Sequence, residues 1–265
     1  MSKILYTNGD SFTAGAELAL EMILPKRAVE TRYGVRVNPI TARVRDAHNA
    51  EIAEIYKQDT PEIAAYDEEC KRRAWPAKLG KMLGYDVVNA AKSGESNGHI
   101  AHTTIKDVTE LLKHNAAEDL FVVVMITGMD RILIPFYDET RTVILGYDPD
   151  EPTMKQFRKM YLEHANDEFL FLSTLNYIYS IENFLYRHKI RHCFVDSVLF
   201  KTTIRAYLDT NTAMYGNLPK VSYCMWDILE ENPKEQWIMY GGHFDERLHE
   251  IFAERIADDF KSGKL

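Results

Sequence analysis

The sequence predicts an α/β protein built on a parallel β-sheet, because short apolar, β-rich runs alternate along the chain with segments of helical periodicity. The chain also places a serine directly after its first strand and a histidine before its last helix. The predicted strands are Lys3–Thr7, Asp86–Asn89, Leu120–Ile126 and Arg191–Asp196. The predicted helices are Ala77–Leu83, Asn97–Asn115, Asn166–His188 and His243–Phe260.

The length of the chain fits one domain. With 265 residues, of which 46% are hydrophobic, the chain can bury a sizeable core. We therefore expect a single α/β domain over residues 1–265. The segment Tyr137–Glu163 is predicted to be a loop, because prolines and acidic residues punctuate it. The segment Phe200–Gln236 is aromatic-rich, and we expect it to be irregular and to wall a site.

A long charged segment, Ala14–Arg73, follows the serine turn and is predicted to be helical between Ala47 and Arg73. Its alternating charges cannot fill a buried strand, so we expect it to stay out of the sheet. Insertions at the carboxyl edge of a sheet commonly build a lid or a partner surface, including one for a second copy of the chain. The alternative is a solvent-exposed helical insertion that does not contact substrate.

Charge and composition exclude several partners. The 32 basic and 40 acidic residues give a net charge of −8, without a basic face for a phosphate backbone, so we expect no nucleic-acid partner. The three cysteines lack metal-ligand spacing, so we expect them to be buried thiols of a protein in a reducing compartment. No signal-peptide pattern or membrane-length apolar window is present, so we expect a cytoplasmic protein without a membrane partner. The pairs His99/His102 and His243/His249 lack the carboxylates of a zinc helix, and we expect no metal and no cofactor.

The serine lies in a small turn, Gly9-Asp10-Ser11, that closely follows the run Ile4-Leu5-Tyr6. Such turns lift a serine hydroxyl out of the carboxyl edge of an α/β sheet, where ligands of parallel sheets bind. The turn therefore predicts a nucleophile at Ser11. The alternative for Ser11 is a helix N-cap, a common role of serine.

The histidine lies in the turn Gly241-Gly242-His243, before a segment with apolar residues at helical spacing. A serine after the first strand and a histidine before the last helix can meet at one sheet edge, where the imidazole takes the proton of the hydroxyl. We therefore predict a nucleophile–base pair of Ser11 and His243. The alternative for His243 is a cap or a surface histidine at the start of a helix.

These residues resemble the SGNH (GDSL) family of serine hydrolases, whose sequence blocks lie in this order. The first block matches Gly9-Asp10-Ser11, and the second resembles the stretch from Val88 to Asn97, with Gly94 at the family's glycine. The resemblance implies an α/β class, three-layer α/β/α flavodoxin-like (SGNH hydrolase) fold with a parallel sheet and insertions at its carboxyl edge. The residues of these blocks are most similar to those of SGNH-type proteins of tailed bacteriophages. This resemblance would associate the protein with a virion.

Two later blocks carry a substituted functional residue. The third should read Gly-x-Asn-Asp and here reads Gly128-Met129-Asp130-Arg131. The last should read Asp-x-x-His, and Tyr240 stands where the aspartate belongs. The family arrangement implies that the backbone amides of Ser11 and Gly94 are oxyanion donors. Asp10 and Asn97, in the two matching blocks, are secondary candidates for the site.

The substitutions leave two roles open. An ionised Asp130 carboxylate has no proton to give to an oxyanion. Arg131 could donate instead, or Asp130 and Arg131 could form a local salt bridge that closes the strand end. The second ring nitrogen of His243 could be held by Asp130, by Asp245 or by a backbone carbonyl, with Asp130 preferred because its strand end faces the same edge. Asp245 is also explained by the dipole of the last helix.

The resemblance implies a serine esterase or acylhydrolase that forms an acyl-serine intermediate on a small-molecule or glycan ester. The alternative is a catalytically impaired SGNH-fold protein with a binding or structural role, for instance as a phage component. Tyr240 and Asp130 favour this alternative. The presence of Ser11, Gly94 and His243 together favours the enzyme.

Overall fold

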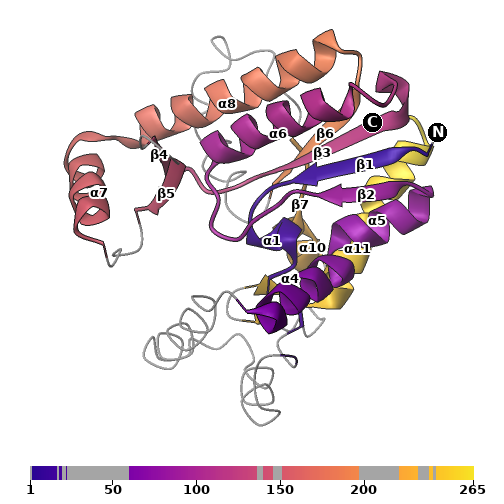
Figure 1. Cartoon of the computed structure of the whole chain (residues 1–265), viewed down its shortest axis with the longest axis horizontal. Helices are drawn as coiled ribbons and strands as arrows, with labels where there is room; N and C mark the ends of the chain where they lie inside the picture. The colour runs from indigo at the N-terminus through magenta and orange to yellow at the C-terminus, as the bar shows by residue number, and fades with distance from the viewer. Residues whose placement is uncertain are drawn as a thin grey trace.

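The computed structural model of the chain describes residues 2–16, 18–19, 22, 60–135, 140–145, 151–196, 221–231, 239–240 and 243–265. Its centre is a five-stranded sheet in the order β2-β1-β3-β6-β7, in which every neighbouring pair is parallel (Figure 1). The strands are β1 (Ile4–Asn8), β2 (Asp86–Asn89), β3 (Leu120–Ile126), β6 (Arg191–Asp196) and β7 (Val221–Cys224). This is the flavodoxin-like strand order, whose ligands bind beyond the carboxyl edge where the order reverses, here between β1 and β3.

Helices cover both faces of the sheet. Alternate residues of β3 point to opposite faces, so Val123 packs with α5 (Trp75–Leu83) and α11 (Glu246–Lys261). Val122 packs with α6 (Asn97–Leu111) and α8 (Asp167–Arg187) on the other face. Figure 1 shows α6 and α8 on one side of the sheet and α5 and α11 on the other. The predicted three-layer α/β/α, flavodoxin-like fold is therefore confirmed.

The main helices begin at side-chain caps. The N-cap of α6 is Ser96, that of α8 is Asn166 and that of α11 is Asp245, and each side chain accepts a hydrogen bond from a backbone N–H of the first turn. Asp245 explains why α11 begins at Glu246 and not at the predicted residue 243. The helix α5 begins two residues earlier than predicted, because Pro76 lies in its first turn, where a missing N–H costs nothing. The helix α6 ends at Leu111, before the predicted residue 115.

Two segments predicted to be irregular contain regular structure, and those predictions were wrong. The segment 137–163 contains β5 (Thr140–Ile144) and most of α7 (Pro152–His164). Pro152, one of the prolines that suggested a loop, is at the first position of α7, where its fixed φ favours a helix. The segment 200–236 contains β7 and α10 (Met225–Glu231).

A small layer extends from the carboxyl end of β3. The strand β4 (Arg131–Pro135) pairs with β5 in an antiparallel hairpin. Ile132, Val143 and Met154 join this hairpin to α7 in an apolar cluster of its own. Figure 1 shows the hairpin and α7 beyond the end of the sheet. The layer is therefore positioned to wall whatever binds at the carboxyl edge.

Part of the segment 14–73 packs against the domain. The helix α4 (Pro61–Arg73) begins after Thr60, whose hydroxyl accepts a hydrogen bond from the N–H of Ile63, and it buries Tyr66 and Cys70. It packs beside α5 and beside the short helix α1 (Ser11–Ala14). The part of this segment that the structure describes contains no strand. Residues 23–59, including the first half of the helix predicted over 47–73, lie outside the described residues, and the lid or partner role stays a prediction.

The remaining elements are the 3₁₀ turn η2 (Ala117–Asp119) and the two-residue strands β8 (Met239–Tyr240) and β9 (His243–Phe244). Cys70, Cys193 and Cys224 are buried thiols that take part in no disulfide, and their burial was predicted. Among the described residues, no helix has both the length and the apolar character needed to cross a bilayer.

Candidate active site

The serine turn follows β1 in a tightly packed position. A Cβ on Gly9 would lie 2.4 Å from Thr13 Oγ1 and 2.8 Å from Met125 Cβ, so only glycine fits beside β3. Asp10 is the N-cap of α1, because its Oδ1 accepts a hydrogen bond from the N–H of Phe12. Ser11 is consequently the first helical residue and not the cap. The alternative reading of Ser11 as an N-cap was therefore wrong.

The loop after β2 runs beside this turn. The side-chain amide of Asn89 donates to the carbonyl of Thr13 at 3.0 Å, and the backbone N–H of Lys92 donates to the carbonyl of Gly9 at 3.4 Å. Gly94, farther along the loop, has φ +83°, a conformation that side chains disfavour. A Cβ added to Gly94 would meet nothing within 4 Å, so the space beside it is open.

The ends of β1 and β3 meet the start of α6 through buried polar groups. The side-chain amide of Asn97 donates to the carbonyl of Thr127 at 2.8 Å and accepts from the N–H of Thr127 at 2.9 Å. The hydroxyl of Thr127 donates to Asp10 Oδ2 at 2.8 Å. The side chain of Asn97 therefore holds the backbone of Thr127, after β3, against the start of α6. Sequence reasoning did not single out Thr127, whose place directly after a buried strand was the available signal.

Arg131 points into the site, and Asp130 lies at the surface. Arg131 Nη1 lies 3.3 Å from Asp10 Oδ2 and donates to the carbonyl of Glu95 at 3.4 Å. The side chain of Asp10 is 1% exposed and that of Arg131 is 19% exposed. Asp130 is exposed, and its backbone carbonyl accepts from the N–H of Leu145. A cation is thus held between the serine turn and the loop that carries Gly94.

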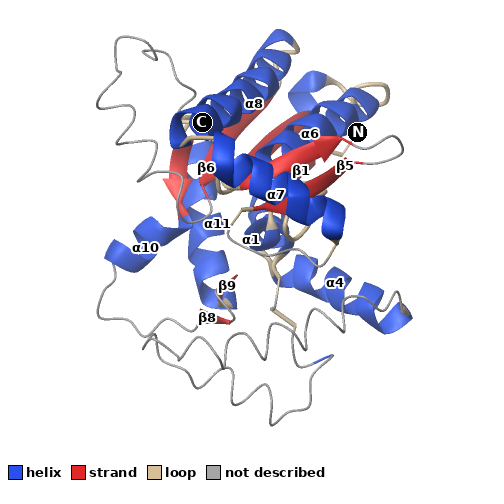
Figure 2. Ribbon diagram, turned by 90° about the vertical axis from the view of Figure 1, so that its left-hand side faces the viewer, coloured by secondary structure: helices blue, strands red, loops and turns tan. Residues whose placement is uncertain are grey.

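The backbone of His243 lies close to the serine turn, while the side chain of His243 falls outside the described part of the structure. Residue 243 pairs with Tyr240 across the β8–β9 hairpin. Its neighbour Phe244 is buried and packs against Phe12, with ring centroids 5.2 Å apart. Figure 2 shows β9 below α1, in agreement with this contact. The fold thus brings the strand of His243 beside the serine turn.

The other histidine and carboxylate candidates have structural contacts. Asp245 Oδ1 accepts from the N–H of Leu248 at 3.0 Å as the cap of α11. His249 is buried, and its Nδ1 accepts from the N–H of Trp75 at 3.1 Å. His99 Nδ1 lies 3.5 Å from Glu95 Oε2. Within the described ranges, no group of three or more His, Cys, Asp or Glu side chains is placed to hold a metal ion.

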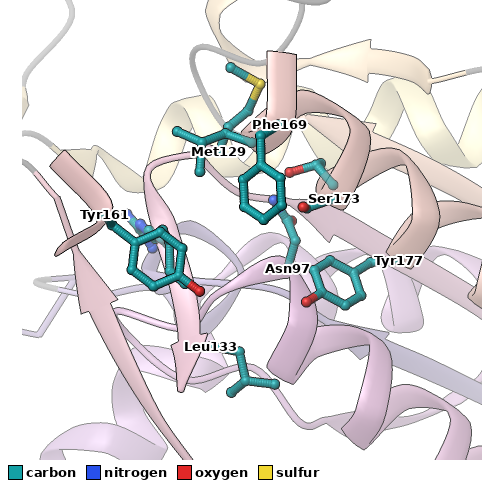
Figure 3. A pocket seen from close by; sticks show the side chains of 11 residues that line it. Asn97, Met129, Leu133, Tyr161, Phe169, Ser173 and Tyr177 are labelled. Carbon is teal, nitrogen blue, oxygen red and sulfur yellow. The ribbon is translucent and has the colours of Figure 1, made fainter. Parts of the chain in front are cut away.

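A cleft of about 70 Å³ opens between the β4–β5 layer and α8. Arg131 and Asn97 line it on the side of the serine turn, and Tyr161, Phe169 and Tyr177 supply aromatic walls. Figure 3 shows the hydroxyls of Tyr161 and Tyr177 on the facing sides of their rings, with Phe169 beyond them. Burial and the neighbouring Tyr161 raise the pKa of Tyr177, so its phenol stays neutral and can donate a hydrogen bond. Sequence reasoning missed these tyrosines.

A second cavity, of about 330 Å³, lies on the other side of the serine turn. Ala14 and Ala16 line it from the turn, Lys71 from α4 and Lys92 from the loop after β2. The part of α4 that the structure describes therefore borders a cavity at the carboxyl edge.

Solved structures similar to this chain are lipolytic and esterase proteins. A member of the lipolytic G-D-S-L family from Veillonella parvula DSM 2008 has 10% identity and a TM-score of 0.46, over 97% of this chain and 98% of that chain. TesA has 14% identity and a TM-score of 0.46, over 98% and 99%. The psychrotrophic esterase EstA from Pseudoalteromonas sp. has 10% identity and a TM-score of 0.44, over 98% and 97%. Similarity at this level assigns no activity.

Sequence comparison gives a family without an assigned function. No curated protein matches the sequence. The sequence model of a family described as a family of unknown function, DUF6071, matches residues 53–226, which is more than half of the chain. The chain belongs to the DUF6071 family.

Proposed function

We propose that the protein is a serine ester hydrolase in which Ser11 is the nucleophile and His243 is the general base. The observation that carries this proposal is the contact between Phe12 and Phe244, which packs the serine turn against the strand of His243. In addition, Asp10 and not Ser11 is the N-cap of α1, so capping does not require the hydroxyl of Ser11. Both residues lie beyond the carboxyl edge of a flavodoxin-like sheet, which is where ligands of such sheets bind.

The proposed reaction is acyl transfer through an acyl-serine. Ser11 Oγ attacks the ester carbonyl carbon while His243 takes the hydroxyl proton, and the imidazolium then returns that proton to the leaving alcohol. A water molecule, activated by the same imidazole, attacks the acyl-serine and releases a carboxylic acid. The N–H groups of Ser11 and Gly94 are the proposed donors to the oxyanion, each typically worth a few kcal/mol of barrier. The open space beside Gly94 supports this assignment.

The group that orients His243 belongs to the same proposal. Tyr240, in the position of the family's aspartate, carries no charge at neutral pH. Asp130 stays the preferred partner because it follows β3 at the same edge of the sheet and its side chain is exposed. Asp245 and a backbone carbonyl are the other candidates, and one oxygen of Asp245 already serves the cap of α11.

Hydrolysis of p-nitrophenyl acetate by Ser11→Ala, His243→Ala and the double variant tests the pair. Residues that act as one unit are not additive, so each single variant and the double variant should lose a similar factor, about a thousandfold or more. Ser180→Ala and His188→Ala, two exposed residues of α8 and its end, are matched controls. Unchanged rates in both site variants would overturn the proposal, as would losses that simply multiply.

The second candidate is a catalytically impaired protein of the same fold with a binding or structural role. The presence of Tyr240 and Asp130 at the family's Asp and Asn positions favours it. The association with phage proteins and the glycan or small-molecule nature of the ester rest on the sequence resemblance. A role of residues 14–73 as a lid or as a partner surface also rests on sequence, with the packing of α4 beside α1 as its structural support.

A further inference from the structure

The cleft beside Arg131 has the features of a binding site. It begins next to the serine turn, because Arg131 and Asn97 both line it and both connect to Asp10, directly or through Thr127. Its tyrosine walls come from two separate helices, with Tyr161 on α7 and Tyr177 on α8 (Figure 3). A ligand in the cleft would therefore touch the candidate active site at one end and the hairpin layer at the other.

Arg131 has N–H donors that its contacts with Asp10 and Glu95 do not use. Its two contacts with Asp10 and the Glu95 carbonyl both use Nη1. Within the part of the chain that the structure describes, Nη2 and Nε have no hydrogen-bond partner. A guanidinium stays charged at any ordinary pH and presents its N–H groups in a fixed fork that matches a carboxylate. An anionic oxygen at the cleft mouth would satisfy these donors.

The side chains that line the cleft and the volume of the cleft determine which groups the ligand can carry beyond its anionic oxygen. Beyond Arg131, Leu133 and Phe169 supply apolar surface, with the tyrosine hydroxyls at the sides. A Cβ on Gly98 would lie 3.0 Å from both Leu133 and Tyr177, so glycine there lets these two side chains close the cleft. The cleft is small, about 70 Å³, and this size favours a short acyl group of a few carbons.

We propose that this cleft is the acyl subsite of the enzyme and takes short-chain carboxylic acyl groups, with Arg131 as the donor to the acyl oxygen. This inference rests on the proposed ester hydrolysis, and it names the substrate class as short-chain acyl esters. In the acylation step Arg131 adds a charged donor to the amides of Ser11 and Gly94. After hydrolysis the same guanidinium holds the carboxylate product.

Binding of carboxylates tests the subsite without any turnover. Sodium acetate, butyrate and octanoate are titrated into the full chain and followed by the NMR signals of the ligands. The wild-type chain should bind acetate and butyrate, and it should bind octanoate at least tenfold more weakly. Arg131→Gln should weaken butyrate binding at least tenfold, and Arg187→Gln, an exposed arginine at the end of α8, should leave it unchanged.

A second variant avoids the buried ion pair of Arg131. Tyr177→Ala removes a wall of the cleft and should narrow the difference between octanoate and butyrate at least threefold, whereas Tyr186→Ala, an exposed tyrosine of the same helix, should not. Equal binding of octanoate and butyrate by the wild-type chain would overturn the proposal, as would full butyrate affinity in Arg131→Gln or the absence of carboxylate binding.

The two proposals fail separately. Carboxylate binding without labelling of Ser11 by a fluorophosphonate would overturn the hydrolase and keep the cleft as a carboxylate site. Labelling of Ser11 without carboxylate binding would overturn the acyl subsite alone.

Discussion

The pair of Asp10 and Arg131 should be the most sensitive point of the candidate site. Asp10→Asn keeps an oxygen for the N–H of Phe12 and removes the charge that faces Arg131 at 3.3 Å. Losing one partner of a buried ion pair costs about 3–5 kcal/mol, and because Arg131 is partly exposed we expect about 2–3 kcal/mol. Weakening of the hydrogen bond from Thr127 adds up to about 1 kcal/mol. The predicted loss in free energy of unfolding is therefore about 3 kcal/mol.

Urea denaturation of Asp10→Asn, Arg131→Gln and the double variant measures this loss and its origin. If the two side chains form one unit, the double variant should lose less than the sum of the singles, with a coupling of about 1–3 kcal/mol. Thr127→Val, which removes only the hydroxyl, should cost no more than about 1–2 kcal/mol. A loss below about 0.5 kcal/mol for Asp10→Asn, or additive single effects, would refute the reasoning that Asp10 fixes Arg131.

Three further predictions concern single positions. Gly94→Ala and the control Gly84→Ala, both at positive φ with open space around the new Cβ, should each lose about 1–2 kcal/mol of stability, but only Gly94→Ala should lower ester turnover; equal turnover would remove Gly94 from the site. Asp130→Asn should cut turnover by orders of magnitude if Asp130 orients His243, whereas higher turnover would give it the family's asparagine role and an unchanged rate would exclude both. Burial raises the pKa of the Cys193 thiol to about 12 and also raises that of Cys70, so Ellman's reagent at pH 8 should react with the three cysteines only after urea is added; fast reaction of the native chain would contradict their burial.

The layered core could be predicted from sequence because its signals are local. The continuous apolar run of β3 can only be buried on both faces, and it specified the central strand to the residue. The strand β7 was missed because its four residues lie in a long aromatic-rich segment. Pairing with β6, and not a local sequence pattern, determines that these residues form a strand. The hairpin of β4 and β5 was missed for the same reason, since its apolar residues pack on α7 and not on the sheet.

The candidate site was predictable as far as motifs reach. The Gly9-Asp10-Ser11 turn and the loop of Gly94 were named from sequence, and hydrogen bonds join them in the structure. The orientation of Arg131 could not be predicted, because adjacent residues at a strand end can point either way, and it is Asp10, far away in sequence, that fixes the guanidinium. The cleft could not be predicted either, because Tyr161 and Tyr177 come from two helices whose packing no local pattern specifies.

Covalent labelling of the native chain by a fluorophosphonate tests the central claim most directly, because it requires an activated serine and no knowledge of the substrate. Digestion and mass spectrometry of the labelled chain should find one equivalent of label on the peptide that contains Ser11. Labelling should be lost in Ser11→Ala, should fall strongly in His243→Ala, and should be unchanged in Ser180→Ala. An unlabelled wild-type chain, or label on a serine other than Ser11, would contradict the account.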